Sequence, residues 1–326
     1  MPAWGADASH GKFGNDPALS AAEKQTLVDW ADAKAPAGKA KDAPAAVKFI
    51  EGWNIGQMYE IPTSGTLEYT RYTLPLNFKE DRWVAAAEIR PGNRTVVHHV
   101  IAYLREPGSK WLEGAPAGEP IVKIKASDGG PRSQLVGYAP GVPARPETPG
   151  RAILVKAGSD VVLEMHYTPN GKAAADLTKA GIIFAKEPPV ERLAGFSAGN
   201  HRVVIPPGDG AYEVRAAMKM PREARLVNLT PHMHLRRKDF EYIAKYPAGE
   251  KEVLLRVPRY DFNWQHTYEL AEPKVLPAGT VIECIAHFDN SPDNAANPDA
   301  KAEVRWGDQS WEEMMIGFGA LAVDAK

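Results

Sequence analysis

The sequence contains very little cysteine, which excludes several kinds of site. Cys284 is the only one in 326 residues, so no disulfide can form within the chain, and cysteine-rich zinc or iron–sulfur centres are excluded. No CxxCH motif occurs, so the chain cannot itself attach a c-type haem. Cys284 lies in the middle of an expected strand, TVIECIAHF, where we expect a buried and unreactive thiol.

Excess charge, long apolar runs and nucleotide-binding loops are also missing. With 39 basic and 41 acidic residues the formal net charge is −2, which gives no electrostatic basis for binding nucleic acid. No apolar run approaches the roughly 20 residues of a membrane helix. The first residues, MPAWGADASHGKFGND, lack the basic and apolar regions of a secretory signal. Neither GxSxG, GxGxxG nor GxxxxGK[ST] occurs, so we expect no nucleophile elbow or phosphate cradle.

The sequence instead contains many short strand patterns. Alternating or β-branched runs such as TVVHHVIAYL, SDVVLEMHY and ARLVNLT are separated by turn sequences such as PGNR, PNGK and LPAGT. No long amphipathic helix interrupts them. At 326 residues and 44% hydrophobic composition the chain can bury two cores. We therefore predict an all-β fold of two consecutive antiparallel β-sandwich, or jelly-roll, domains.

The N-terminal part differs from the rest of the chain. Ser20 and Glu23 form a capping-box pattern before a short helix, and Leu27 and Trp30 follow at helical spacing. The stretch APAGKAKDAPAA then has the composition of a linker. We expect residues 1–47 to be an appendage that cannot form a core alone. Sandwich domains are expected over residues 48–193 and 194–326, with the break inside EPPVERLAGFSAGN.

Five histidines and a methionine have the spacing of metal ligands. His232 and His234 are two residues apart, so on a strand both imidazoles point to one face and could bind one metal. His98 and His99 are adjacent and would point to opposite faces, so they can share a metal only at a bulge or strand end. Each motif alone is more often explained by structural or surface histidines.

The remaining candidates are His166, at a strand end before the turn PNGK, and a methionine in WEEMMIGF. Met314 and Met315 alternate faces on the last strand; one should join the core and the other face a cleft, and spacing does not choose between them. A thioether is a poor ligand for zinc, magnesium or calcium but suits Cu(I). The six positions therefore predict two copper sites of unequal softness.

The ordered set HH, H, HxH and M on two β-sandwiches resembles the copper type II, ascorbate-dependent monooxygenases, the family of the peptidylglycine α-hydroxylating and dopamine β-monooxygenases. The resemblance covers roughly residues 48–326 and implies two copper ions per chain. It implies that His98, His99 and His166 hold an electron-transfer copper. His232, His234 and Met314 would hold the copper that binds O2, because Glu313-Met314 matches a Glu-Met pair of the family.

The implied activity is insertion of one oxygen atom of O2 into a C–H bond of a small-molecule substrate, with an electron passing between two coppers across a wet cleft. Residues 260–318 (YDFNWQ, LPAGT, HFDNS, WGDQSWEEMMIGF) resemble bacterial members whose copper domains often follow a c-type cytochrome domain. The first residues are similar to the tail of such a domain, so Met1 marks either a truncation point or a native start. A cytochrome or ascorbate as reductant, and a periplasmic or secreted location, are implied.

The chain also departs from the peptide-amidating members of that family. Thr230, Ile316 and Phe318 stand where those enzymes carry Arg, Asn and Tyr to grip a substrate carboxylate, so we expect a less polar substrate. Glu164, two residues before His166, is a candidate for orienting an imidazole. Two alternatives remain: a copper-binding or electron-relay protein without hydroxylase activity, and a structural sandwich pair with incidental histidines.

Overall fold

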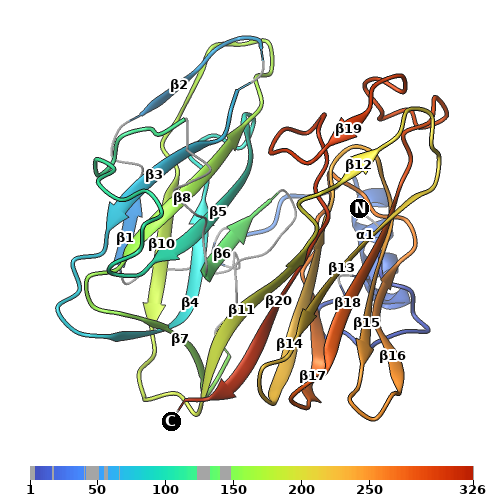
Figure 1. Cartoon of the computed structure of the whole chain (residues 1–326). Helices are drawn as coiled ribbons and strands as arrows, with labels where there is room; N and C mark the ends of the chain where they lie inside the picture. The colour runs from blue at the N-terminus through green and yellow to red at the C-terminus, as the bar shows by residue number, and fades with distance from the viewer. Residues whose placement is uncertain are drawn as a thin grey trace.

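The computed structural model describes residues 4–325 except 17, 40, 42–50, 55–57, 66, 123–132 and 140–147, and residues 51–54 by their backbone. The described chain is all-β with one N-terminal helix, as the sequence predicts (Figure 1). The helix is α1 (Ala21–Asp32). The strands are β1 (Glu51–Asn54), β2 (Tyr59–Ile61), β3 (Thr70–Pro75), β4 (Arg82–Arg90), β5 (Val97–Arg105), β6 (Ser133–Tyr138), β7 (Arg151–Val155), β8 (Asp160–Tyr167), β9 (Ala174–Asp176), β10 (Lys179–Phe184), β11 (Glu191–Gly199), β12 (Val204–Ile205), β13 (Tyr212–Lys219), β14 (Ala224–His232), β15 (Arg237–Lys245), β16 (Lys251–Val257), β17 (Tyr268–Leu276), β18 (Val281–Phe288), β19 (Val304–Arg305) and β20 (Ile316–Asp324).

The strands form two layered halves that share one sheet. An eight-stranded sheet has the order β1-β10-β4-β7-β11-β20-β14-β17, and two four-stranded sheets have the orders β3-β8-β5-β6 and β13-β18-β15-β16. The eight-stranded sheet is continuous because β7 and β11 pair in parallel through Glu191 with Arg151 and Arg192 with Ala152. The expected ranges of the domains began at residue 48, which lies outside the described residues.

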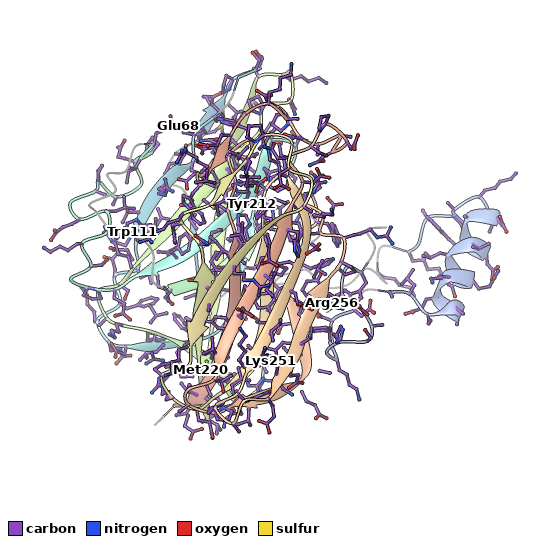
Figure 2. All side chains as sticks on the ribbon, turned by 45° about the vertical axis from the view of Figure 1, so that its right-hand side comes forward. Glu68, Trp111, Tyr212, Met220, Lys251 and Arg256 are labelled. Atoms are coloured by element: carbon purple, nitrogen blue, oxygen red, sulfur yellow. The ribbon has the colours of Figure 1, made fainter. Side chains whose placement is uncertain are left out.

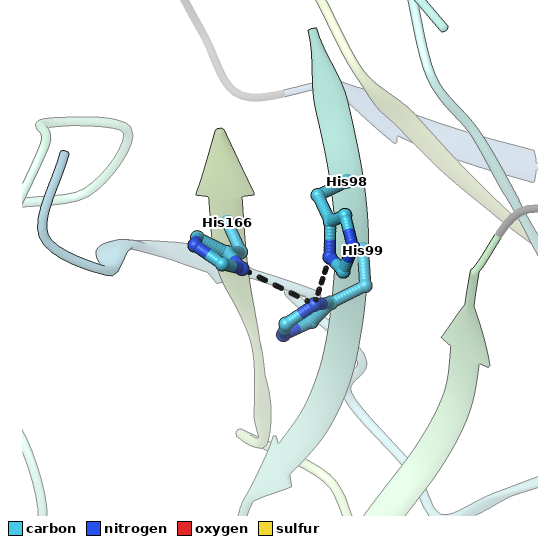
Figure 3. A group of neighbouring side chains, drawn as sticks. All are labelled: His98, His99 and His166. Carbon is cyan, nitrogen blue, oxygen red and sulfur yellow. Dashed lines mark hydrogen bonds between the residues drawn. The ribbon is translucent and has the colours of Figure 1, made fainter. Parts of the chain in front are cut away.

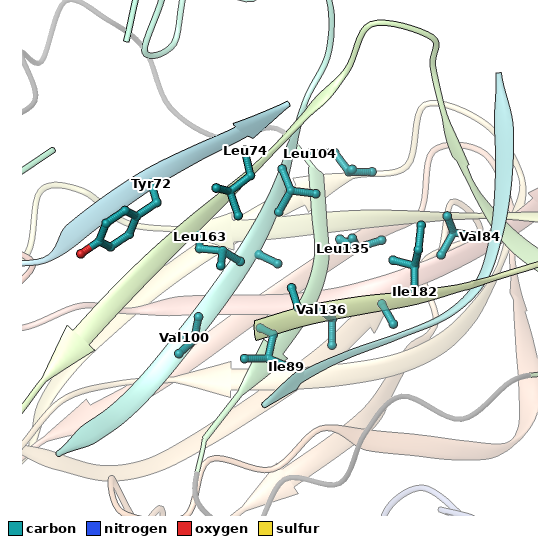
Figure 4. Packing of buried hydrophobic residues seen from close by; sticks show 14 of the residues in the cluster. Tyr72, Leu74, Val84, Ile89, Val100, Leu104, Leu135, Val136, Leu163 and Ile182 are labelled. Atoms are coloured by element: carbon teal, nitrogen blue, oxygen red, sulfur yellow. The ribbon is translucent and has the colours of Figure 1, made fainter. Parts of the chain in front are cut away.

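Each half has its own hydrophobic core. In the first half, Tyr72 of β3, Val100 of β5 and Ile182 of β10 pack between the layers (Figure 4). In the second half, Phe240 of β15 and Leu321 of β20 belong to a separate buried cluster. Buried residues alternate with less buried ones along β15, as burial of one face predicts, whereas nearly all residues of β3 and β8 are buried.

Helix α1 forms as the capping box predicts, yet it buries none of its residues. The Glu23 amide donates to the Ser20 hydroxyl at 3.2 Å, and the Ser20 amide donates to the Glu23 carboxylate at 2.8 Å. Figure 2 shows the helix standing away from the sheets. No helix in the described part of the chain is long and apolar enough to cross a membrane. Met1 and half of the predicted linker lie outside the described residues.

The segment before α1, residues 4–16, packs against the C-terminal half. The Ala271 amide donates to the Lys12 carbonyl at 2.8 Å, and the Gly14 amide donates to the Glu269 carbonyl at 2.9 Å. The segment thus pairs with the edge of β17 and protects part of its unpaired backbone. The ring of Trp4 lies 4.9 Å from that of Tyr268 in an edge-on contact, which anchors the beginning of the segment.

Candidate metal centres

His98, His99 and His166 come together at one end of the first half (Figure 3). The pairing of β5 with β8 shifts register between Val97 and His99, so that His99 stands opposite His166. This irregularity is the bulge that two adjacent histidines need in order to face one metal. Nδ1 of His98 lies 3.0 Å from Nδ1 of His99, which is 3.4 Å from Nδ1 of His166.

The geometry of these three imidazoles, here called the first group, fits one metal ion. Two nitrogens that each lie about 2 Å from an ion are at most about 4 Å apart, and both Nδ1 separations are shorter. Burial lowers the pKa of His166 to about 3, and the pKa values of His98 and His99 are lowered by the same cause. The imidazoles are therefore neutral near pH 7, the form that binds metals.

The residues behind the first group overturn one expectation. Glu164 was expected to orient an imidazole, but its carboxylate accepts a hydrogen bond from Nε of Arg71 at 2.6 Å. The reason is register, since Arg71 of β3 stands directly opposite Glu164 of β8. The Arg71 guanidinium also lies 3.6 Å from Asp308 and so connects the two halves. The neighbour of His166 is instead Tyr69, whose ring stacks on it at 4.7 Å.

His232 and His234 form a second group at the end of β14, with ring centroids 5.1 Å apart. Nδ1 of His232 donates to the side-chain oxygen of Gln265 at 2.6 Å, and Nδ1 of His234 donates to the Glu312 carbonyl at 3.3 Å. Because these oxygens only accept, the ring protons lie on Nδ1 and each Nε2 keeps a lone pair for a metal. Burial lowers the pKa of both histidines.

Met314 and Met315 were expected on the last strand but lie just before it, since β20 begins at Ile316; they still differ in burial. Met315 is fully buried in the second core, while Met314 is partly exposed. Glu313, which precedes Met314, accepts hydrogen bonds from the amides of His234 at 2.9 Å and Arg236 at 2.6 Å. Its carboxylate thus fixes the chain before Met314 against the chain that follows β14. Burial raises the pKa of Glu313 to about 8, against the opposite effect of these amides.

One phenyl ring lies between the two groups. Phe262 stacks on His98 with a centroid distance of 5.2 Å and an interplanar angle of 21°. The same ring meets His234 edge-on at 5.9 Å and 81°. Phe262 therefore contacts one imidazole of each group, and the wet cleft implied by the family resemblance stays a prediction. The sequence motifs YDFNWQ and Glu313-Met314 contain Phe262, Gln265 and Glu313, but no contact with the histidines was predicted for them, since no local periodicity marks such contacts.

A cavity of about 340 Å³ lies near the second group, although neither His232 nor His234 lines it. It is lined on one side by β6 of the first half and on the other by β11, β14, β17 and β20. Asn228, Thr230 and His232 alternate along β14 and so share one face of the sheet. Asn228 and Thr230 line the cavity together with Phe318, whose ring centroid is 6.3 Å from that of His232.

Two further histidines and the single cysteine occupy structural or surface positions. His287 bonds Asp239 at 2.7 Å, and His201 packs on Trp306 with a centroid distance of 4.1 Å. Cys284 is fully buried on β18, as expected, and burial raises the pKa of its thiol. None of these side chains joins the described metal-binding groups.

Comparisons with known proteins do not identify the chain. No family profile and no curated protein matches its sequence. Among solved structures it is similar to infectious bursal disease virus, Gt strain, with 8% identity and a TM-score of 0.23 over 89% of this chain and 74% of the viral chain. The VP2 subviral particle of that virus gives 8% identity and a TM-score of 0.23 over 87% and 76% of the two chains. A TM-score this low supports no argument about function.

Proposed function

We propose that the chain is a copper-dependent monooxygenase that hydroxylates a C–H bond of a small-molecule substrate with O2, as the resemblance to the ascorbate-dependent copper monooxygenases implies. The observation that carries the proposal is the placement of a three-imidazole group and a two-imidazole group on either side of Phe262. Two separate groups of neutral nitrogen donors this close together suit one-electron transfer between two metals.

The donor chemistry of the two groups supports copper. Neutral imidazoles suit copper, zinc, iron and nickel, whereas magnesium and calcium require oxygen ligands. The carboxylate nearest the second group, Glu313, is already bonded to backbone amides. Met314, the next residue, offers a thioether, which favours Cu(I). We propose one copper held by His98, His99 and His166, and a second held by His232, His234 and Met314.

The chain's own residues would prepare this chemistry. Copper in the two groups would supply single electrons and O2 activation. Burial keeps the imidazoles neutral, Gln265 and the Glu312 carbonyl fix the rings of the second group, and Phe262 contacts one ring of each group. The cavity beside His232 would hold the substrate next to the second group. We further propose ascorbate or a c-type cytochrome as reductant and a periplasmic or secreted location.

The experiment is copper reconstitution followed by measurement of bound copper and of O2 consumption with ascorbate. We expect two coppers per chain. The Met314→Ala variant should lose O2 consumption while the first copper is still reduced, whereas Met58→Ala, at an exposed position, should behave as the parent protein.

Three results would count against the proposal. Unchanged O2 consumption in Met314→Ala overturns the role of that residue. Copper cycling without any O2-dependent product, in every variant, favours the electron-relay alternative. Fewer than one copper per chain favours a structural protein.

A further inference from the structure

We propose that the cavity beside His232 binds a small uncharged molecule with an apolar body and one neutral hydrogen-bonding group, and that the N-terminal segment, through Asn15, forms part of its wall. The inference deepens the proposed monooxygenase function and rests on it. The inference adds to that function the chemical class of the substrate and a role for residues 4–16.

The lining of the cavity disfavours an anion. Of the described residues that line it, none is Lys or Arg, and its ionisable side chains are Glu269 and His266. The Glu269 carboxylate accepts a hydrogen bond from the Asn228 amide at 3.3 Å. A bound carboxylate would lose its hydration, gain no cationic partner among the described lining residues and lie near another carboxylate, all of which cost free energy.

A cation is disfavoured by the cost of burying it. An ammonium group would share the Glu269 carboxylate with the Asn228 amide, and the loss of its hydration can exceed the gain from such a pair. An uncharged ligand avoids both costs.

The floor of the cavity is apolar and has open space. Gly195 of β11 shares the sheet face of Leu193, and a Cβ built on Gly195 would meet only the Gly319 carbonyl, at 3.9 Å. Phe318 and Ala320, on the neighbouring strand β20, also line the cavity. Apolar atoms of a ligand would therefore replace water against side chains and glycine backbone, which is favourable.

Neutral polar groups line the opposite wall. The side-chain amide of Gln134 on β6 has no hydrogen-bond partner among the residues that the structure describes. Thr230 and Thr267 are already bonded to each other through their hydroxyls at 2.9 Å. Because an amide both donates and accepts, Gln134 suits a ligand amide, hydroxyl or carbonyl group.

Asn15 brings the N-terminal segment into the wall. Its side chain donates to the Thr267 carbonyl at 2.7 Å and accepts from the Glu269 amide at 2.9 Å. These two bonds hold Asn15 against the start of β17, whose residues Thr267 and Glu269 also line the cavity. Loss of Asn15 would open the cavity at this side.

The test uses three probes of matched shape on the metal-free full chain: 3-phenylpropanamide, 3-phenylpropanoate and 3-phenylpropylamine. Calorimetry or ligand-observed NMR should show that the amide binds at least about tenfold more tightly than either charged probe, because of the cost of burying charge. Equal binding of the three, tighter binding of a charged probe, or no binding of the amide overturns the proposed class.

Variants locate the binding. Gly195→Leu fills the cavity and should abolish amide binding. Gln134→Leu, at a partly buried position, should remove the preference for the amide over the charged probes. Asn15→Ala should weaken binding severalfold. Asn200→Ala is its matched control, because Asn200 also donates to a carbonyl and accepts from an amide, at 3.0 and 2.9 Å, away from the cavity. Unchanged amide affinity in Gly195→Leu and Gln134→Leu overturns the assignment of the cavity.

Failure of this inference is distinguishable from failure of the proposed function. If the amide binds in the cavity of the metal-free protein but the copper-loaded protein consumes no O2, the monooxygenase proposal fails and the cavity stands. If O2 consumption depends on Met314 while the Gly195→Leu variant binds the amide normally, the cavity assignment fails and the monooxygenase stands.

Discussion

The two histidine groups differ in what holds their rings. In the first group the Nδ1 atoms face one another at 3.0 and 3.4 Å. In the second group each Nδ1 donates to an oxygen outside the group, at 2.6 and 3.3 Å. The first group therefore directs Nδ1 toward a shared centre, and the second directs Nε2. Backbone register positions the first group, whereas hydrogen-bond partners position the second.

This difference suits different chemistry. A group fixed by two neighbouring strands of one sheet, β5 and β8, has little freedom to change its coordination, which favours simple electron transfer. The second group lies where β14 ends, near a cavity. With Met314 as its proposed third ligand it would have a softer donor set, and the nearby cavity would give access to a ligand, as a reacting centre needs.

The largest expected effect separates the two groups. His166→Ala removes a ligand of the first group only, so we expect the loss of one of two coppers, with the second group still loaded. Copper analysis and electron paramagnetic resonance measure this outcome. His287→Ala, at a surface ion pair with Asp239, is the control. Loss of both coppers would mean that the five histidines share one site.

A second prediction concerns the orientation of the second group. Gln265→Leu removes the acceptor for Nδ1 of His232, and outer hydrogen-bond partners of metal ligands are worth about 10–100-fold in affinity. We expect copper affinity to fall by that order at the second group and to stay unchanged at the first. Gln25→Ala on α1, where the side chain bonds Asp29 at 2.8 Å, is the control. An equal loss at both groups would contradict this assignment.

A third and smaller effect tests the contact between the groups. Phe262→Leu removes the ring that stacks on His98 and touches His234, and aromatic contacts are worth about 0.5–1.5 kcal/mol. We expect copper affinity to change by roughly two- to tenfold at both groups, which no other single change should do. Phe184→Leu, whose ring packs against Phe78 at 5.6 Å, is the control. A change confined to one group would show that the ring does not couple them.

The sequence predicted the fold because its signals are local. Period-two runs and turn residues define strands wherever they occur, and the Ser20–Glu23 capping box depends on only four residues. The same local logic indicated that one of Met314 and Met315 enters the core. Strand alternation also predicted that His98 and His99 could bind one metal only at a bulge or a strand end. The bulge itself arises from pairing with β8, far along the chain.

The remaining features of the site depend on long-range contacts. Glu164 was a reasonable partner for His166 by strand alternation, yet Arg71 on a third strand engages it. Phe262 and Gln265 lie in the connection between β16 and β17, where no periodicity predicts which strands they will meet. The docking of Asn15 on Thr267 joins residues that are 252 positions apart. Such contacts follow from the packing of whole layers and leave no mark on neighbouring residues.

The smallest effect concerns acid. The pKa of His166 is about 3 in the folded protein, below its ordinary value of 6.5. Between these values the unfolded chain binds a proton that the folded chain does not, so the free energy of unfolding should decrease as pH falls from about 6.5 toward 3. In the second group, the Gln265 and Glu312 acceptors oppose the lowering of the histidine pKa values. Urea unfolding of the metal-free protein should therefore show a flatter pH dependence in His166→Gln than in His232→Gln. The opposite order would contradict this assignment, because it would place the stronger proton linkage in the second group.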